Sequence, residues 1–167
     1  MNYPIIPISE DYADGFAEAL DSVARELRYL AFIEGPPRDR TLAFIRRNIA
    51  ENWPQLIALD EHRVIGWCDI TPRDRPVFSH IGVLGIGIID GYRGRGIGPR
   101  LLETALQAAK ARGLSRIELT VREQNPIAIQ LYERFGFFKE GLHVNGVKIH
   151  GQYENHLSMA LLIPENA

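Results

Sequence analysis

The stretch Ile81-Gly-Val-Leu-Gly-Ile-Gly-Ile-Ile-Asp-Gly-Tyr-Arg-Gly-Arg-Gly-Ile-Gly-Pro99 decides the predicted fold. Residues 81–89 are apolar residues and glycines without a charge, which indicates a buried strand. Pro99 suits the first turn of a helix, where its missing N–H costs nothing. After Pro99, apolar residues recur at helical spacing, at Leu102, Ala105, Leu106 and Ala109. Gly113 is expected to end this helix. The stretch therefore predicts a strand, a glycine-rich loop and a helix.

The loop between this strand and this helix predicts an anion-binding site. Gly94, Gly96 and Gly98 have no side chains that would cover the backbone N–H groups, and a helix N-terminus attracts negative charge. Arg93 and Arg95 add positive charge next to the glycines. Phosphate or pyrophosphate is the expected ligand. The alternative is an ordinary turn between a strand and a helix, without a ligand.

Two common nucleotide-binding motifs do not match this loop. A Walker-type loop that began at Gly91 would need a lysine where Ile97 stands. A dinucleotide-binding fingerprint that began at Gly94 would need a glycine where Pro99 stands. The sequence therefore argues against ATP and NAD as ligands.

Length and composition indicate a single domain, residues 1–167, with 46% hydrophobic residues. The net charge of −2 and the pI near 6.2 argue against nucleic acid or an anionic membrane as a partner. Cys68 is the only cysteine, which excludes an intrachain disulfide, and the first residues lack the features of a signal peptide. A cytoplasmic location is therefore expected. The five histidines and Cys68 show no metal-ligand spacing, so no metal site is predicted.

Periodicity along the rest of the chain predicts a mixed α/β fold. We expect about seven strands in a mixed, mostly antiparallel sheet, with one parallel pair and helices on both faces. The expected strands are 3–8, 55–59, 64–70, 81–89, 117–121, 137–144 and 147–163, and the expected helices are 11–30, 41–52, 99–112 and 125–136.

Local signals refine three of these elements. Ser9 is predicted to cap the first helix, because a serine side chain can accept from a first-turn N–H. Ile45 and Ile49 are predicted to lie on the buried face of the second helix. The last two strands form a hairpin around Asn145-Gly146, and the turn is placed anywhere from 143 to 151.

A second motif lies in the segment Asn125-Pro-Ile-Ala-Ile-Gln-Leu-Tyr-Glu-Arg-Phe-Gly-Phe137. It resembles N-x-x-A-x-x-L-Y-x-x-x-G-F, a signature of the GNAT family of N-acetyltransferases, and matches every fixed place. Arg93-x-x-Gly96-x-Gly98 resembles the acyl-CoA-binding motif of the same family. The resemblance extends over residues 5–163 in the order of elements. A finer likeness is to the branch that acetylates small amines, amino acids or protein N-termini.

The resemblance implies acetyl-CoA as the cofactor. In this family the central strand and its parallel neighbour splay apart, and the pantetheine lies between them along residues that correspond to Ile86, Gly87 and Ile88. A backbone N–H there would hold the thioester oxygen. Asn125 would orient the cofactor arm, although a helix N-cap is its other reading. The pyrophosphate would lie on the loop, at Arg93, Gly94, Arg95, Gly96, Ile97, Gly98 and Pro99.

Tyr132 is the general acid that the resemblance implies. A phenol beside the sulfur can protonate the departing thiolate, because a free thiol has a pKa of about 8.5. Packing in the core is the alternative role for this tyrosine.

Many relatives carry a basic carboxylate on the central strand, but residues 81–89 contain none. Glu34, His80 and Asp69 are the candidates for the base, each with a purely structural alternative.

The predicted function is direct acetyl transfer from acetyl-CoA to a primary amine of a small molecule, an amino acid or a protein N-terminus. A covalent route through Cys68 is a variant of it. The alternative is a noncatalytic CoA-binding or sensing domain, which the missing strand carboxylate favours and Tyr132 opposes. No nucleic acid or membrane partner is expected, and edge strands or the terminal hairpin offer a route to a homodimer.

Overall fold

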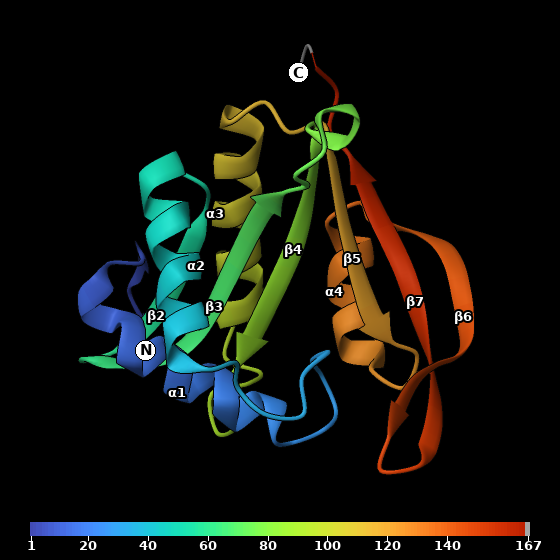
Figure 1. Cartoon of the computed structure of the whole chain (residues 1–167), viewed down its shortest axis with the longest axis horizontal. Helices are drawn as coiled ribbons and strands as arrows, with labels where there is room; N and C mark the ends of the chain where they lie inside the picture. Colours follow the sequence, from blue (N-terminus) through green and yellow to red (C-terminus); the bar gives the residue numbers. More distant parts are fainter. Residues whose placement is uncertain (166–167) are drawn as a thin grey trace. The chain divides into compact units, whose positions relative to one another are not determined.

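The computed structural model describes residues 1–165 (Figure 1). Helices and strands follow one another in the order that the sequence predicts. The strands are β1 (Ile5–Pro7), β2 (Gln55–Asp60), β3 (Arg63–Pro72), β4 (Ile81–Ile88), β5 (Arg116–Arg122), β6 (Phe138–Ile149) and β7 (Gln152–Leu162). The helices are α1 (Ala13–Ala24), α2 (Arg38–Glu51), α3 (Ile97–Ala111) and α4 (Pro126–Arg134), with short 3-10 turns η1 (Glu10–Tyr12) and η2 (Pro76–Phe78).

The strands form a seven-stranded sheet in the hydrogen-bonded order β1-β2-β3-β4-β5-β7-β6. The β4–β5 pair is parallel, and its register runs from Ile81 opposite Arg116 to Val83 opposite Glu118. The pairs β1–β2, β2–β3, β5–β7 and β6–β7 are antiparallel. The predicted mixed α/β sheet with one parallel pair is therefore confirmed, and α3 is the helical crossover that joins the parallel strands.

Two compact units make up the chain, and their boundary falls inside β4. The first unit contains residues 1–71 and 84–112, and the second contains residues 72–83 and the chain from Gly113 onward. Within residues 1–165, no helix combines the length and the apolar character that crossing a membrane requires.

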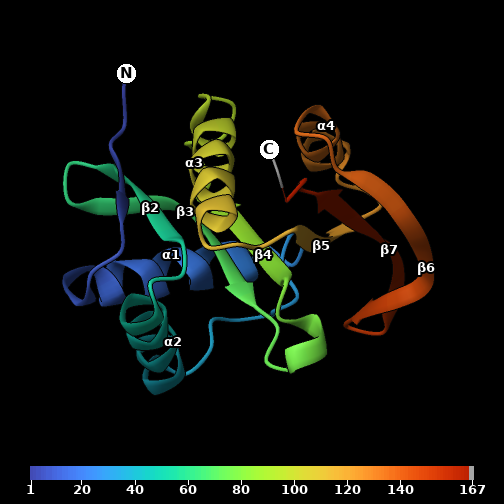
Figure 2. The same cartoon turned by 90° about the horizontal axis from the view of Figure 1, so that it is seen from above.

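The first unit packs helices on both faces of its strands (Figure 2). A Cβ added at Gly66 on β3 would lie 3.4 Å from Leu101 of α3. The next residue, Trp67, instead contacts Phe16 of α1, with the ring centroids 5.8 Å apart. Successive side chains of a strand point to opposite faces, so α3 covers one face and α1 covers the other.

Helix α1 differs from its prediction at both ends. It ends at Ala24, earlier than the predicted Leu30, because Leu27 adopts a left-handed conformation with φ 60° that a helix does not accept. Ser9 makes no side-chain cap, and the residue that precedes α1 is Tyr12. The predicted Ser9 cap is wrong, because the turn η1 separates Ser9 from the helix.

Helix α2 turns a different face inward from the one predicted. Ile45 is fully buried, as expected, but Ile49 is 46% exposed. Thr41 and Asn48 are buried with Ile45 instead. The amide of Asn48 is satisfied there, because its Nδ2 donates to Oε1 of Gln55 on β2 at 2.9 Å. This hydrogen bond allows a polar residue in the core, which the apolar pattern could not indicate.

The hairpin of the second unit turns at His150 and Gly151, at the end of the range that the sequence allows. Asn145-Gly146, the preferred turn in the sequence, forms a bulge in β6 between His143 and Val147. The backbone N–H of Asn145 donates to Oδ1 of Asn155 at 2.9 Å, and this contact holds the bulge on β7.

Candidate functional site

The loop after β4 is open at its glycines. Gly91, Gly94 and Gly96 have φ angles of 84°, 73° and 78°, which favour glycine over any residue with a side chain. A Cβ added at any of the three would have no atom within 4 Å. Among the described residues, nothing therefore fills the space above this backbone, and an extended ligand could approach it closely.

Helix α3 begins at this loop and presents its N-terminus there. Gly96 is the N-cap, and no side chain caps the helix. The first N–H groups of a helix have no partner within it, and they carry the positive end of its dipole. A phosphate or pyrophosphate can supply the missing acceptors. The open glycines and the uncapped helix together fit the pyrophosphate of CoA.

Arg93 braces the loop rather than standing free for a ligand. Its guanidinium donates to both carboxylate oxygens of Glu26, at 2.8 and 2.5 Å. Its Nε donates to the backbone oxygen of Ile88, the last residue of β4, at 2.9 Å. The hydrogen bond to Glu26 raises the pKa of Arg93, so the brace stays charged. Arg93 thus ties the loop to the end of β4.

Arg95 and Arg100 also hold partners within the first unit. Nη1 of Arg95 donates to the Tyr3 hydroxyl at 2.8 Å, and its guanidinium lies 5.2 Å from the centre of the Tyr92 ring. Nη1 of Arg100 donates to the backbone oxygen of Tyr3 at 3.0 Å. Arg93 and Arg95, which the sequence places next to the glycines, are therefore engaged with protein partners, and the backbone N–H groups are the candidate donors for an anion.

The glycines of β4 face β3 instead of an open surface. A Cβ at Gly87 would lie 2.3 Å from Cη2 of Trp67, and one at Gly85 would lie 3.2 Å from Oδ1 of Asp69. Side chains of β3 therefore occupy the room that the missing Cβ atoms leave. The role of residues 86–88 toward a cofactor stays a prediction.

Asp69 is an isolated carboxylate on β3. It is half-buried, and burial raises the pKa of its carboxyl to about 7. Within residues 1–165, no hydrogen bond or ion pair engages its carboxylate. An acid whose pKa lies near neutrality can exchange protons at physiological pH, which is what a general base requires.

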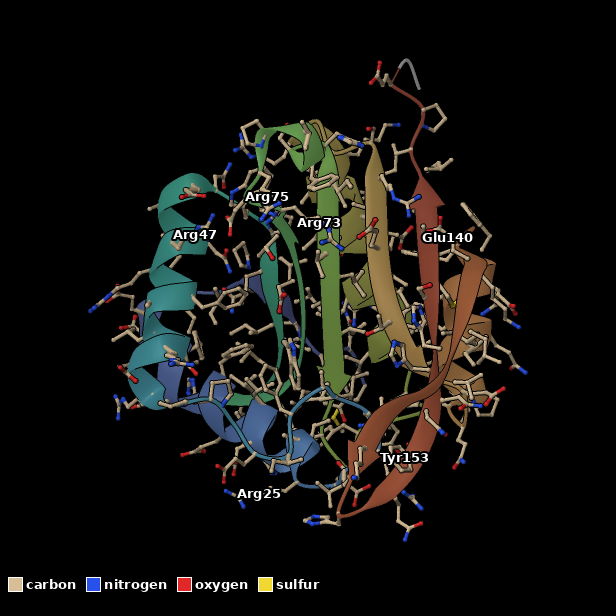
Figure 3. The ribbon with its side chains drawn as sticks, turned by 45° about the vertical axis from the view of Figure 1, so that its right-hand side comes forward. Arg25, Arg47, Arg73, Arg75, Glu140 and Tyr153 are labelled. Carbon is tan, nitrogen blue, oxygen red and sulfur yellow. The ribbon has the colours of Figure 1, made fainter. Side chains whose placement is uncertain are left out.

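Glu34 and His80, the other candidates for the base, lie at the surface. Glu34 is 65% exposed, and its carboxylate is 3.4 Å from Nη2 of Arg25, which Figure 3 shows on the outside of the first unit. His80 is exposed and directly precedes β4, whereas the glycine loop follows that strand. Both residues are exposed, whereas Asp69 is half-buried.

Asn125 and Tyr132 belong to the second unit. Oδ1 of Asn125 accepts from the backbone N–H of Ala128 at 3.2 Å, so the predicted N-cap of α4 is confirmed. Tyr132 is buried, and its ring centroid lies 5.7 Å from that of Phe137. Their roles toward a cofactor stay predictions.

The chain matches the family model "Acetyltransferase (GNAT) family" over residues 19–137. The L-amino acid N-acetyltransferase of Escherichia coli K12 is 31% identical over 107 residues, which cover 64% of this chain and 66% of that protein. Across three curated relatives, the matched regions cover between 23% and 66% of the relative's own length.

Solved structures match the fold over nearly the whole chain. An acetyltransferase of the GNAT family from Streptococcus pneumoniae is 28% identical with a TM-score of 0.89, covering 97% of this chain and 100% of that chain. A phosphinothricin acetyltransferase from Sinorhizobium meliloti, solved in complex with acetyl-CoA, is 20% identical with a TM-score of 0.91, covering 99% of this chain and 90% of that chain. The second of these likenesses concerns the fold alone.

Proposed function

Since the chain belongs to the GNAT family of acetyltransferases, we propose that it transfers an acetyl group from acetyl-CoA directly to a primary amine. One observation carries the proposal: the open glycine loop meets an uncapped helix N-terminus, and Arg93 ties this loop to the end of β4. The arrangement supplies donors for a pyrophosphate next to a strand along which a pantetheine arm could run.

In this proposal, three groups of residues bind the pyrophosphate, bind the acyl carbonyl oxygen and donate a proton. The N–H groups at Gly94, Gly96 and the start of α3 bind the pyrophosphate. Acetyl-CoA supplies an activated acyl group, and a backbone N–H within residues 86–88 donates to its carbonyl oxygen as negative charge develops there. Tyr132 donates the proton that the departing sulfur takes up.

The acceptor is a primary amine of a small molecule, an amino acid or a protein N-terminus. The amino-acid acetyltransferase among the relatives supports this class. A covalent route through Cys68 is disfavoured, because this residue is fully buried and burial raises the pKa of its thiol well above the usual range. A noncatalytic CoA sensor is the second candidate, favoured by the lack of a carboxylate in β4.

CoA and acetyl-CoA are expected to raise the melting temperature, whereas ATP and NAD are expected to raise it much less. A ligand at 100 times its Kd stabilises the native state by about 2.7 kcal/mol. Differential scanning fluorimetry with the four ligands at equal concentration measures the shifts. Equal shifts for all four would contradict the proposed cofactor.

Gly96→Ala is expected to weaken acetyl-CoA binding by about tenfold, or about 1.4 kcal/mol, because a methyl group would enter the open space of the loop. Gly151→Ala is the matched control. Gly151 has a similar φ of 81° and equally open surroundings, but it lies in the β6–β7 turn. Calorimetric titration of both variants compares them, and equal affinities would place the pyrophosphate elsewhere.

A further inference from the structure

A small polar cluster interrupts the apolar core of the first unit. It consists of Asn48 on α2, Gln55 on β2 and Asp69 on β3, and we call it the core polar cluster. Asn48 and Gln55 are only 2% and 3% exposed. The hydrogen bond between their amides uses Oε1 of Gln55 and does not involve its Nε2. Within residues 1–165, this buried Nε2 has no hydrogen-bond partner.

Gln55 lies beside Asp69 on the same face of the sheet. The two residues are directly opposite each other in the antiparallel register of β2 and β3. Side chains of directly opposite residues project to one face, with Cβ atoms about 4.5–5.5 Å apart. The unpartnered amide N–H2 of Gln55 therefore lies within reach of the region in front of the Asp69 carboxylate.

Gly85 brings this carboxylate against β4. A Cβ at position 85 would lie 3.2 Å from Oδ1 of Asp69, closer than ordinary contact allows. A residue with a Cβ at position 85 would therefore require the carboxylate to shift by a few tenths of an ångström. Gly85 directly precedes residues 86–88, the part of β4 that the proposed function assigns to the acyl carbonyl. The cluster thus places a carboxylate where the reacting amine would need a base.

Three other carboxylates of the first unit have partners, unlike Asp69. Glu26 is paired with Arg93, and Glu34 lies 3.4 Å from a guanidinium nitrogen of Arg25. Asp60 accepts a hydrogen bond of 2.6 Å from the Tyr92 hydroxyl. Burying a carboxylate without a partner is costly, so such groups point to function more often than to stability.

Resting on the proposed function, we propose that Asp69 is the catalytic base and binds the ammonium form of the acceptor, with Gln55 as a positioning residue whose polar amide lies beside the carboxylate. Asp69 takes one proton from the ammonium, so that an N–H bond breaks and an O–H bond forms. The freed lone pair of the nitrogen forms the bond to the acyl carbon, and the carbon–sulfur bond breaks. The nitrogen then loses a second proton to water, and the sulfur takes one up from Tyr132 or water. If Tyr132 gives that proton, it regains one from water. Asp69 returns its proton to solvent, which reaches it because it is half-buried.

Among residues 1–165, burial is the cause of the raised pKa of Asp69, and no charged side chain contributes to it. Gln55 of β2, Asn48 of α2 and Gly85 of β4 do not titrate, and α1 reaches this face with Phe16 against Trp67. Cys68, the adjacent residue of β3, stays a neutral thiol because burial raises its pKa. The loss of the Asp69 proton thus governs the acidic limb of kcat/KM, which we expect near pH 7.

Asp69→Asn tests the proposal against Asp14→Asn as control. Asp14 is an exposed aspartate of α1, whose Oδ1 is 2.6 Å from Nη2 of Arg38. Steady-state rates with a panel of amines are measured from pH 5.5 to 9, together with acetyl-CoA affinity. We expect Asp69→Asn to lower kcat/KM by about 10²- to 10⁴-fold and to remove the limb near pH 7, with unchanged acetyl-CoA affinity. Asp14→Asn is expected to behave like the wild type.

Two further variants distinguish a base from a structural residue. Gln55→Met is expected to shift the acidic limb to higher pH, because an apolar side chain replaces the polar amide beside the carboxylate and disfavours its charged form, while most of the rate at high pH remains. Gly85→Ala is expected to lower kcat without loss of acetyl-CoA binding, because the methyl group would displace the carboxylate. If Asp69→Asn keeps wild-type rates and an acidic limb of kcat/KM near pH 7, Asp69 is not the base. That result would leave the proposed function intact. A wild-type protein that acetylates no amine would overturn the proposed function and this inference with it.

Discussion

The free energy of unfolding of Asp69→Asn, relative to that of the wild type, is expected to be up to about 4 kcal/mol higher at pH 8 than at pH 4. The pKa of Asp69 is about 7 in the native state, whereas the ordinary value for the unfolded chain is 3.8. Between these values the unfolded chain has lost the proton and the native protein keeps it, so stability falls as the pH rises through this window. A pKa difference of about three units, at about 1.36 kcal/mol per unit, gives about 4 kcal/mol. This value is an upper limit, because solvent reaches part of the carboxylate.

Urea unfolding of the wild type and of Asp69→Asn at pH 4, 6 and 8 measures this effect. The difference between the two proteins is the relevant quantity, because all other titrating groups are common to both. Asp14→Asn serves again as the control, since its exposed carboxylate should give a small difference at every pH. A difference between wild type and Asp69→Asn that does not change with pH would show that Asp69 has an ordinary pKa in the native state.

The two effects expected of Asp69→Asn have opposite signs. The variant should unfold less readily at pH 8 and should also catalyse acetyl transfer poorly. A residue that lowers stability at the working pH is retained when activity requires it, as in other strained or buried active-site groups. A purely structural aspartate would lower stability when replaced, not raise it.

Tyr132→Phe is expected to lower turnover by about 10²-fold or more while acetyl-CoA affinity changes little. The ring of Tyr132 is buried beside Phe137, and phenylalanine keeps that packing. Only the hydroxyl proton is lost, and with it the proposed donor to the departing sulfur. Tyr132→Ala is expected to destabilise the protein by about 3 to 5 kcal/mol, because it removes a buried aromatic ring.

Turnover, acetyl-CoA affinity and thermal melts of both variants separate catalysis from packing. If Tyr132 served packing alone, the Phe variant would keep wild-type turnover and only the Ala variant would be damaged. A fully active Phe variant would therefore remove Tyr132 from the mechanism and leave water as the acid.

The sequence predicts the order of the strands and helices because the signals for them are local. The uncharged run 81–89, the alternating apolar residues of β5 and the Asn125 cap each lie within one short segment. Predictions that depend on more distant contacts were less reliable. Ile49 is exposed because Asn48 finds a partner on β2, and Asn145-Gly146 forms a bulge because Asn155 of β7 holds it.

The sequence by itself determined the glycine loop and its place before a helix, since the backbone that would hold a pyrophosphate is one continuous stretch. Only the tertiary structure decided which candidate for the base is half-buried and lies against β4. Asp69, Gln55 and Gly85 lie on three different strands, and the pKa of Asp69 depends on the uncharged surroundings that these strands create. Burial and cross-strand contacts arise only when distant segments pack together, so no local pattern of residues encodes them.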